Sequence, residues 1–249
     1  MEKYCSDACD LAARVAEVRA RIDAAARRAH RNPRDILLIA ATKTQSASRV
    51  RQALDAGADA AGENRVQELL EKWEQGAYQN KPLHFIGHLQ QNKVKQVVGR
   101  AALIHSVDSI ALGEAIAAQA DKLGLRQEAL LQVNIGREKT KGGFLPEELP
   151  EALEQLVQLK GLWVKGLMVI PPPVGSEGGI AENDYFMETK QLLIDNLSFF
   201  MHTGSSGVLS MGMSGDYERA VEAGAHMVRV GEAIFGARNA ERPGHNQCV

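Results

Sequence analysis

The sequence predicts an α/β protein folded as a single (β/α)8 TIM barrel, and three observations predict it. Short apolar runs typical of buried strands alternate with helix-like stretches along the 249 residues. Eight strand-then-helix units can be counted, in about the length expected of such a barrel. No all-β or all-α block interrupts the alternation, which favours a parallel sheet. An open, doubly wound sheet is the alternative, because the order of elements does not prove closure.

The chain begins with an amphipathic helix predicted over 6–31, whose apolar face carries Leu11, Val15, Val18 and Ile22. Residues 36–42 are then apolar or small and lead directly to Lys43, which predicts a strand buried on both faces. A helix is predicted over 48–56. Its start is capped by Ser46 or Ser48, and Gly57 stops it.

The same unit then repeats to the end of the chain. The later strands are predicted at 58–64, 83–87, 102–107, 129–135, 162–169, 208–211 and 226–230. The helices after them are predicted at 66–73, 92–98, 110–123, 146–159, 183–197, 216–223 and 233–235. The segment 171–181, rich in Pro and Gly, is expected to be a mobile rim or lid, and 200–206 a loop. No linker is visible, so residues 1–249 are expected to form one domain.

Composition narrows the class of protein. Hydrophobic residues make up 45% and charged residues 24%, with a formal net charge of −2 and no long block of one sign. This argues against a nucleic-acid surface or a membrane-binding face, and no apolar run approaches the roughly 20 residues of a membrane span. The cysteines, Cys5, Cys9 and Cys248, are odd in number and lie near the termini, which indicates a reducing compartment. We expect a cytoplasmic protein.

Polar side chains recur where the predicted strands end. Since the carboxyl ends of all strands share one mouth of a barrel, these side chains should form a polar ring. Its members would be Lys43, Glu63, Asn64, His88, Ser106, Asp108, Asn134, Met168, Ser210, Ser214 and Arg229. The histidines lack carboxylates at metal-ligand spacing, and the serines lack the context of a hydrolase nucleophile. The ring therefore predicts a binding site without a metal.

Lys43 is the reactive candidate in this ring. At the end of a buried strand its ammonium group would be desolvated, which lowers a lysine pKa and supplies the neutral amine for a Schiff base. The alternative is a lysine that only reaches solvent as the strand ends.

Two glycine-containing turns follow the last two strands. One spans 211–216, before a helix, and the other begins at Gly231 and Glu232. Backbone N–H groups at such turns favour a phosphate, and barrels often bind one after strands seven and eight. The alternative is that Gly215 and Gly231 serve turn geometry only. A lysine and a phosphate site in one mouth imply pyridoxal phosphate, a phosphosugar aldolase or another phosphorylated substrate.

Arg229 separates these possibilities, because it is a permanent cation within an otherwise apolar strand. Such an arginine could donate to a pyridine nitrogen and discourage its protonation. That would weaken the ring as the electron sink that most pyridoxal enzymes exploit. The alternative is an ion pair of Arg229 with Glu63 or Asp108.

The residues also match a known family. The matching segments, in order, are ATKT at 41–44, GENRVQE at 62–68, HFIGHLQ at 84–90, IHSVDS at 104–109, QVNI at 132–135, KGG at 141–143, GLM at 166–168, LSMGMS at 209–214, VRVG at 228–231 and AIFG at 233–236. As an ordered set they are highly specific and cover nearly the whole chain. The sequence resembles the pyridoxal phosphate homeostasis proteins, the YggS or PROSC family, whose fold is similar to the barrel domain of alanine racemase.

This resemblance implies a fold type III pyridoxal phosphate site. Lys43 would carry the cofactor as a Schiff base, with Asn64 beside the ring and Arg229 facing the pyridine nitrogen. Ser214 and the amides around Gly231 and Glu232 would hold the phosphate. Met168, Ser210 and Gly215 complete the predicted site. One departure is Glu232, where many members have Thr or Ser, because a carboxylate near a phosphate is unfavourable unless it turns away.

The resemblance further implies a monomeric cofactor carrier or regulator of vitamin B6 pools, which buffers pyridoxal phosphate or delivers it to apo-enzymes. Alanine racemases use a second, β-rich domain that supplies a catalytic tyrosine. This chain is expected to lack that domain, because it ends shortly after the eighth strand, so no turnover is expected. The alternatives are a racemase-like enzyme acting on amino acids and a Schiff-base aldolase that binds no cofactor.

Overall fold

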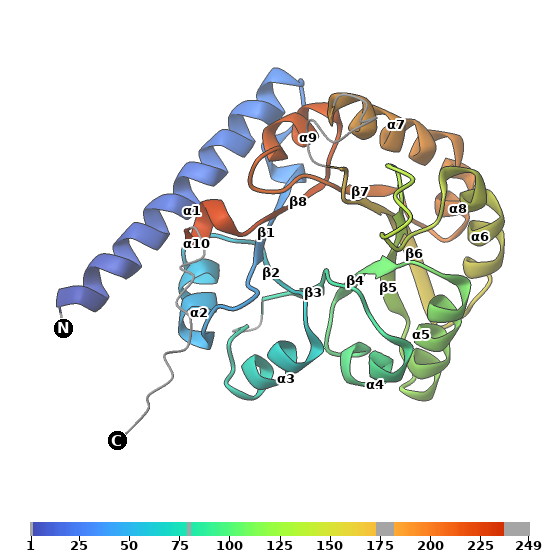
Figure 1. The fold of residues 1–249 in the computed structure, drawn as a ribbon, viewed down its shortest axis with the longest axis horizontal. Helices are drawn as coiled ribbons and strands as arrows, with labels where there is room; N and C mark the ends of the chain where they lie inside the picture. Colours follow the sequence, from blue (N-terminus) through green and yellow to red (C-terminus); the bar gives the residue numbers. More distant parts are fainter. Residues whose placement is uncertain (1, 79–80, 173–181, 237–249) are drawn as a thin grey trace.

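Eight parallel strands close into a barrel in chain order, so that β8 pairs with both β7 and β1 (Figure 1). The structure is a computed structural model that describes residues 2–78, 81–172 and 182–236. The strands are β1 (Leu37–Ala41), β2 (Ala60–Glu63), β3 (Leu83–Phe85), β4 (Leu103–Val107), β5 (Gln127–Val133), β6 (Leu162–Val169), β7 (Val208–Ser210) and β8 (Met227–Val230). Closure confirms the predicted (β/α)8 barrel and excludes the open sheet.

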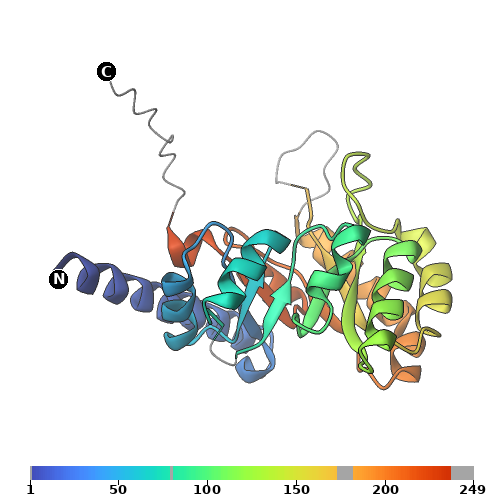
Figure 2. The ribbon, with the colours of Figure 1, turned by 90° about the horizontal axis from the view of Figure 1, so that it is seen from below.

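Helices surround this barrel (Figures 1 and 2). They are α1 (Glu2–Arg28), α2 (Ala47–Asp55), α3 (Val66–Glu74), α4 (Val94–Val97), α5 (Ile110–Lys122), α6 (Leu149–Leu156), α7 (Glu182–Asp195), α8 (Leu197–His202), α9 (Tyr217–Ala223) and α10 (Glu232–Phe235). Short 3-10 turns span Pro33–Asp35, Gln91–Lys93 and Pro146–Glu148. The last two turns form the starts of the helices predicted at 92–98 and 146–159, which are therefore shorter as α-helices than predicted.

The first helix is longer at its start than the sequence predicts and ends earlier. Its predicted apolar face is buried, including Val15 and Ile22, against α2, α9 and α10. The helix stops at Arg28, after which His30 takes a left-handed φ of 55°. Figure 2 shows the first turns of α1 projecting beyond the barrel. Of the two predicted caps of α2, Ser46 is the actual one: its side chain accepts from the N–H of Arg49, whereas Ser48 lies within the helix.

The loop predicted at 200–206 is partly wrong, because α8 continues to His202. Phe200 is fully buried and anchors the helix to the core, so its apolar contact outweighs the turn-forming residues that follow. These residues only end the helix: the Thr203 hydroxyl donates to the carbonyl of Phe200, and Gly204 has a φ of 81°.

The strands present two different faces. Their outward residues, such as Val228 and Val230, join the main core beneath the helices. Leu103, Leu130 and Met168 form a smaller cluster within the barrel, against which Met227 packs. Because side chains alternate along a strand, Arg229 shares the inward face with Met227. The alternation thus places a guanidinium inside the barrel.

Several sequence expectations fall on residues that lie outside the described ranges, namely most of the 171–181 rim and Cys248. Within those ranges, no helix combines the length and the apolar character that crossing a bilayer would require.

Candidate functional site

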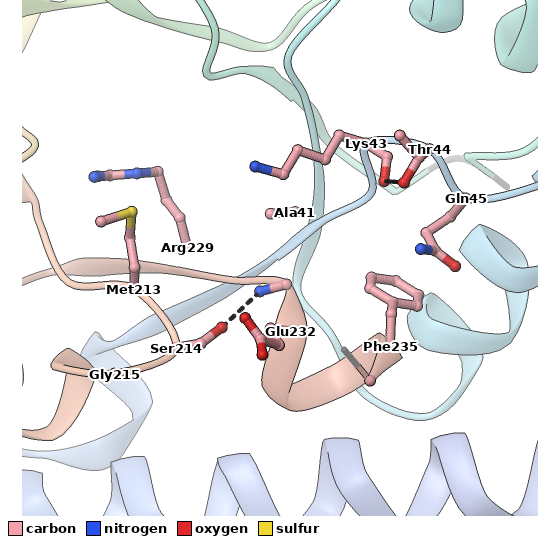
Figure 3. Close-up of a pocket in the computed structure, with 12 residues that line it drawn as sticks. Ala41, Lys43, Thr44, Gln45, Met213, Ser214, Gly215, Arg229, Glu232 and Phe235 are labelled. Atoms are coloured by element: carbon pink, nitrogen blue, oxygen red, sulfur yellow. Dashed lines mark hydrogen bonds between the residues drawn. The ribbon is translucent and has the colours of Figure 1, made fainter. Parts of the chain in front are cut away.

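A cavity of about 310 Å³ opens at the carboxyl ends of β1 and β8, beside the loop that follows β7. Its lining residues are Ala41, Lys43, Thr44, Gln45, Met213, Ser214, Gly215, Arg229, Gly231, Glu232, Phe235 and Gly236 (Figure 3). Six of the nine predicted site residues are therefore brought together here. The other three, Asn64, Met168 and Ser210, do not line this cavity.

Lys43 extends across the cavity toward the guanidinium of Arg229 (Figure 3). The predicted desolvation of its amine is wrong, because Lys43 is exposed. The physical reason is that β1 ends at Ala41, two residues earlier, so Lys43 lies on the loop beyond the sheet. The next residue, Thr44, adopts a left-handed φ of 63°. Lys43 thus faces the cavity from a tight turn at its rim.

Arg229 is buried inside the barrel, with 4% of its surface exposed. Its Nη1 donates to Ser210 Oγ at 2.6 Å, and its Nη2 donates to the carbonyl of Val169 at 2.9 Å. Among the described residues no carboxylate forms an ion pair with it: Glu63 pairs with Lys72, and Asp108 with His88. The ion pair considered as an alternative for Arg229 is thus absent from the described chain. Burial lowers the pKa of Arg229 to about 10, which still leaves it charged at neutral pH.

A chain of hydrogen bonds continues from Arg229 through the barrel interior. Ser210 Oγ lies 2.9 Å from His105 Nδ1, and His105 Nε2 lies 2.9 Å from His84 Nδ1. Burial lowers the pKa of His84 to about 4, and burial together with the neighbouring His84 and Arg229 lowers that of His105 well below its usual value. Both rings are therefore neutral at pH 7. Satisfying every buried donor then requires Ser210 to donate to His105, and His105 to donate to His84.

Ser214, in the loop after β7, and the backbone at the start of α10 form a cradle beside Arg229. Ser214 Oγ accepts from the N–H groups of Gly231 and Ala233, at 3.2 and 3.3 Å (Figure 3 draws the first). Its own hydroxyl proton can therefore be directed into the cavity. Gly212 shapes this loop: its φ is 95°, and a Cβ there would lie 2.6 Å from Ala220 Cβ. Gly215, by contrast, faces open space, since a Cβ there would meet nothing within 4 Å.

The remaining predicted residues have distinct environments. Met168 is fully buried in the inner cluster of the barrel, and Ser210 supports Arg229 from below. Asn64 is partly buried, and its Oδ1 has no hydrogen-bond partner within the described structure. Glu232 is an exposed carboxylate at the first position of α10.

Sequence reasoning missed Lys72 and Glu68, which hold the Lys43 turn from behind, and it wrongly placed Glu63 in the polar ring of the mouth. Glu63, on the outward face of β2, is fully buried and accepts from Lys72 Nζ at 2.8 Å and from Thr42 Oγ1 at 2.6 Å. Burial raises the pKa of Glu63, and the hydrogen bonds from Lys72 and Thr42 oppose that rise. The pair of Glu68 and Lys72, four residues apart on α3, is typical of an exposed helix surface. The sequence of α3 does not show which of its charged residues face the sheet, so it does not predict that Lys72 is buried.

Comparison with known proteins places this geometry in a family. The model of the alanine racemase N-terminal domain matches residues 14–239. A pyridoxal phosphate homeostasis protein of Aquifex aeolicus is 40% identical over 93% of this chain and 99% of its own length. A protein from Bifidobacterium adolescentis, described as unknown, superposes with a TM-score of 0.82 at 34% identity, over 92% of this chain and 96% of its own.

A further solved structure is that of PipY from Synechococcus elongatus PCC7942, described with pyridoxal phosphate bound. It has a TM-score of 0.75 and 33% identity, and the match covers 91% of this chain and all of PipY. The family match spans residues 14–239 and so includes both Lys43 and Arg229. The chain belongs to the alanine racemase N-terminal domain family and, within it, to the pyridoxal phosphate homeostasis proteins.

Proposed function

We propose that this protein binds pyridoxal 5′-phosphate as a Schiff base on Lys43 and acts in intracellular vitamin B6 homeostasis, as a buffer or donor of the cofactor. The observation that carries this proposal is the meeting of Lys43, Arg229 and the Ser214 cradle in one cavity. A primary amine, a buried cation and the Ser214 hydroxyl match the aldehyde, pyridine and phosphate groups of the cofactor. Relatives named for this role and the PipY complex support the proposal.

The residues present fit the cofactor on three counts. Arg229 is a buried guanidinium that pairs with no carboxylate in the described chain, so a ligand acceptor at its open side would offset its desolvation. Ser214 has its lone pairs engaged by two backbone N–H groups and a proton left to donate. The space facing Gly215 is open. In each of these three cases, the fold leaves a hydrogen-bond donor or a space available to the cofactor.

The proposed roles follow from these positions. Lys43 holds the cofactor through its Nζ, while Ser214, Gly215 and the amides near Gly231 and Glu232 bind the phosphate oxygens. Arg229 donates to the pyridine nitrogen, with Ser210 fixing its orientation. Asn64 and Met168 would act at the edge of the ring. When bound, the cofactor supplies an aldehyde that can pass from one amine to another.

Arg229 favours carriage over turnover. It is a donor that stays charged, since its pKa of about 10 lies well above neutrality. A charged donor facing the pyridine nitrogen opposes protonation of that nitrogen and weakens the ring as an electron sink. We therefore propose a carrier without catalytic turnover. We also propose a cytoplasmic, single-domain monomer whose partners are apo-enzymes that need the cofactor, with no role at nucleic acids or membranes.

The first test compares wild type with Lys43→Ala after addition of pyridoxal phosphate, by absorption spectroscopy, borohydride reduction and peptide mapping. We expect an absorption band that is reducible onto Lys43 and lost in the variant. Labelling of other lysines only, or no band, would refute the proposed site and favour a barrel acting on phosphosugars.

The second test separates carrier from enzyme. Loaded protein is mixed with an apo-enzyme and, separately, with amino acids in deuterated water. A carrier restores the apo-enzyme activity and leaves α-protons unexchanged. Exchange of the α-proton at a rate proportional to loaded protein would instead show a racemase-like activity.

A further inference from the structure

The Lys43 turn, residues 42–44, is held from behind by two side chains of α3. Lys72 Nζ donates to the carbonyl of Thr42 at 2.7 Å, and Glu68 Oε2 accepts from the N–H of Thr44 at 2.7 Å. The two side chains also contact each other, at 3.3 Å. The backbone on both sides of Lys43 is thus bonded to α3. The two α3 side chains that make these bonds are four residues apart on the helix.

The side chains at the inner end of this contact are buried. Lys72 is only 6% exposed, and its ammonium is also bonded to Glu63, which is fully buried. The same Oε1 of Glu63 accepts from the Thr42 hydroxyl, so the strand end, the turn and the helix share one charged cluster. Among the described residues Lys72 is the only cation bonded to Glu63, so removing it would leave the buried Glu63 carboxylate without a charged partner.

The turn itself needs this support. Lys43 is exposed and makes no part of the sheet, and Thr44 holds a left-handed conformation that β-branched residues rarely adopt. Without the Glu68 acceptor and the Lys72 donor, the turn would keep two local bonds, from the Gln45 N–H to the Thr42 carbonyl at 3.1 Å and from the Thr44 hydroxyl to the Lys43 carbonyl at 2.6 Å. Neither of these bonds ties residues 43 and 44 to the rest of the fold. The direction of the Lys43 side chain depends on the backbone of these three residues.

We propose that Lys72, together with Glu68, is a positioning residue for Lys43, which sets how fast Lys43 forms and breaks its bond to the cofactor. This inference rests on the proposed function. In the bond-forming step the neutral Nζ of Lys43 attacks the aldehyde carbon, a C–N double bond replaces the C–O double bond, and one water leaves. No oxidant or reductant is needed. Lys72 touches neither reacting atom, so it acts through the backbone of the turn.

The experiment follows bond formation by stopped-flow absorbance after mixing cofactor-free protein with pyridoxal phosphate. Lys72→Met removes the donor to Thr42, and Glu68→Ala removes the acceptor of Thr44. We expect both to slow formation of the Lys43 adduct about tenfold or more, since small displacements of a reacting group have effects of this order. Glu68 is partly exposed, so Glu68→Ala decides the question if Lys72→Met does not fold.

Arg19→Met is the matched control. Arg19 anchors the opposite end of β1, through the carbonyl of Ile36 and an ion pair with Asp59, and lies outside the cavity lining. It should lower the melting temperature while leaving the rate of adduct formation within about twofold of wild type. If Arg19→Met slows the rate as much as Lys72→Met does, the effect is one of general stability and the inference is overturned.

A second readout uses pyridoxine 5′-phosphate, which carries an alcohol in place of the aldehyde and cannot bond to Lys43. Calorimetry should give a similar Kd, within about twofold, for wild type, Lys72→Met and Glu68→Ala. Weaker binding of this analogue in step with the slower rate would mean that the cavity itself is damaged, which contradicts positioning. A normal adduct rate in both variants also contradicts it. Failure of wild type to form any adduct would refute the proposed function instead.

Discussion

Two buried cations on this barrel have opposite surroundings. Lys72, between the barrel and α3, is bonded to the carboxylates of Glu63 and Glu68. Arg229, inside the barrel, is bonded only to a hydroxyl and a carbonyl in the described chain. A buried charge without a counter-ion is costly unless something else compensates it. From this difference we infer that Lys72 stabilises the scaffold, and it supports the proposal that Arg229 binds a ligand.

The largest expected effect comes from removing Lys72, the buried cation that has carboxylate partners. Lys72→Met leaves Glu63 buried without its cation, so we expect the free energy of unfolding of the cofactor-free protein to fall by about 3 kcal/mol. A domain of ordinary stability survives such a loss. Urea unfolding at pH 7 measures it. A fall of less than about 1 kcal/mol would show that the pair does not stabilise the fold.

A change of pH tests the neutral interior beside Arg229. His84 has a folded-state pKa of about 4, below its ordinary 6.5, because of burial. As the pH falls the unfolded chain binds protons first. His84 therefore contributes its full stability above pH 6.5 and loses it between 6.5 and about 4, at up to about 1.4 kcal/mol per pH unit. His84→Gln should have a shallower dependence of unfolding free energy on pH in this window. Parallel curves for both proteins would contradict the neutral-ring assignment.

Replacement of Arg229, the cation without a direct carboxylate contact in the described chain, should have the opposite profile to Lys72→Met. Arg229→Leu removes a desolvated charge, so the unfolding free energy should change by no more than about 1–2 kcal/mol. Binding of pyridoxine 5′-phosphate should weaken about tenfold, since one charge-assisted hydrogen bond is lost. Calorimetry and urea unfolding of the same preparation measure both. A large loss of stability with unchanged binding would reverse the roles assigned to Arg229 and Lys72.

The smallest expected effect concerns Glu232, the exposed carboxylate in the cavity lining. Glu232→Gln removes a negative charge near the proposed phosphate position. We expect the Kd for pyridoxine 5′-phosphate to fall about twofold to threefold at low salt, and the difference to shrink as salt screens the charge. Gln keeps the backbone donors in place. If Glu232→Gln weakens binding, the carboxylate contributes to the site directly.

The fold was predictable because each strand-then-helix unit carries its own local signal. Buried strands appear as apolar runs, and the inward placement of Arg229 follows from its position between Val228 and Val230. The helix at 197–202 was missed because its stability comes from Phe200 packing in the core rather than from local propensity. Tertiary contacts outweigh turn-forming residues there.

The site was predictable only where strand ends define it. Lys43, Ser214 and Arg229 follow from the rule that chemistry lies at the carboxyl mouth. The support of the Lys43 turn by Glu68 and Lys72 was not, because a helix sequence does not reveal which of its charges the sheet covers. The hydrogen-bond chain from Arg229 to His84 depends likewise on four strands meeting at one level, which no single segment encodes.

The pairing of β1 with β8 determines when the cavity can form during synthesis of the chain. Ile39 lies opposite Arg229 in this pairing, so the cavity straddles the seam where the first strand meets the last. A nascent chain displays Lys43 early, but Arg229 and Gly231 emerge only after about nine-tenths of the sequence has been synthesised. Free cofactor encountered during translation finds a lone amine rather than a pocket. Stable retention of the proposed ligand is therefore expected only after β8 has joined β1 and completed the cavity.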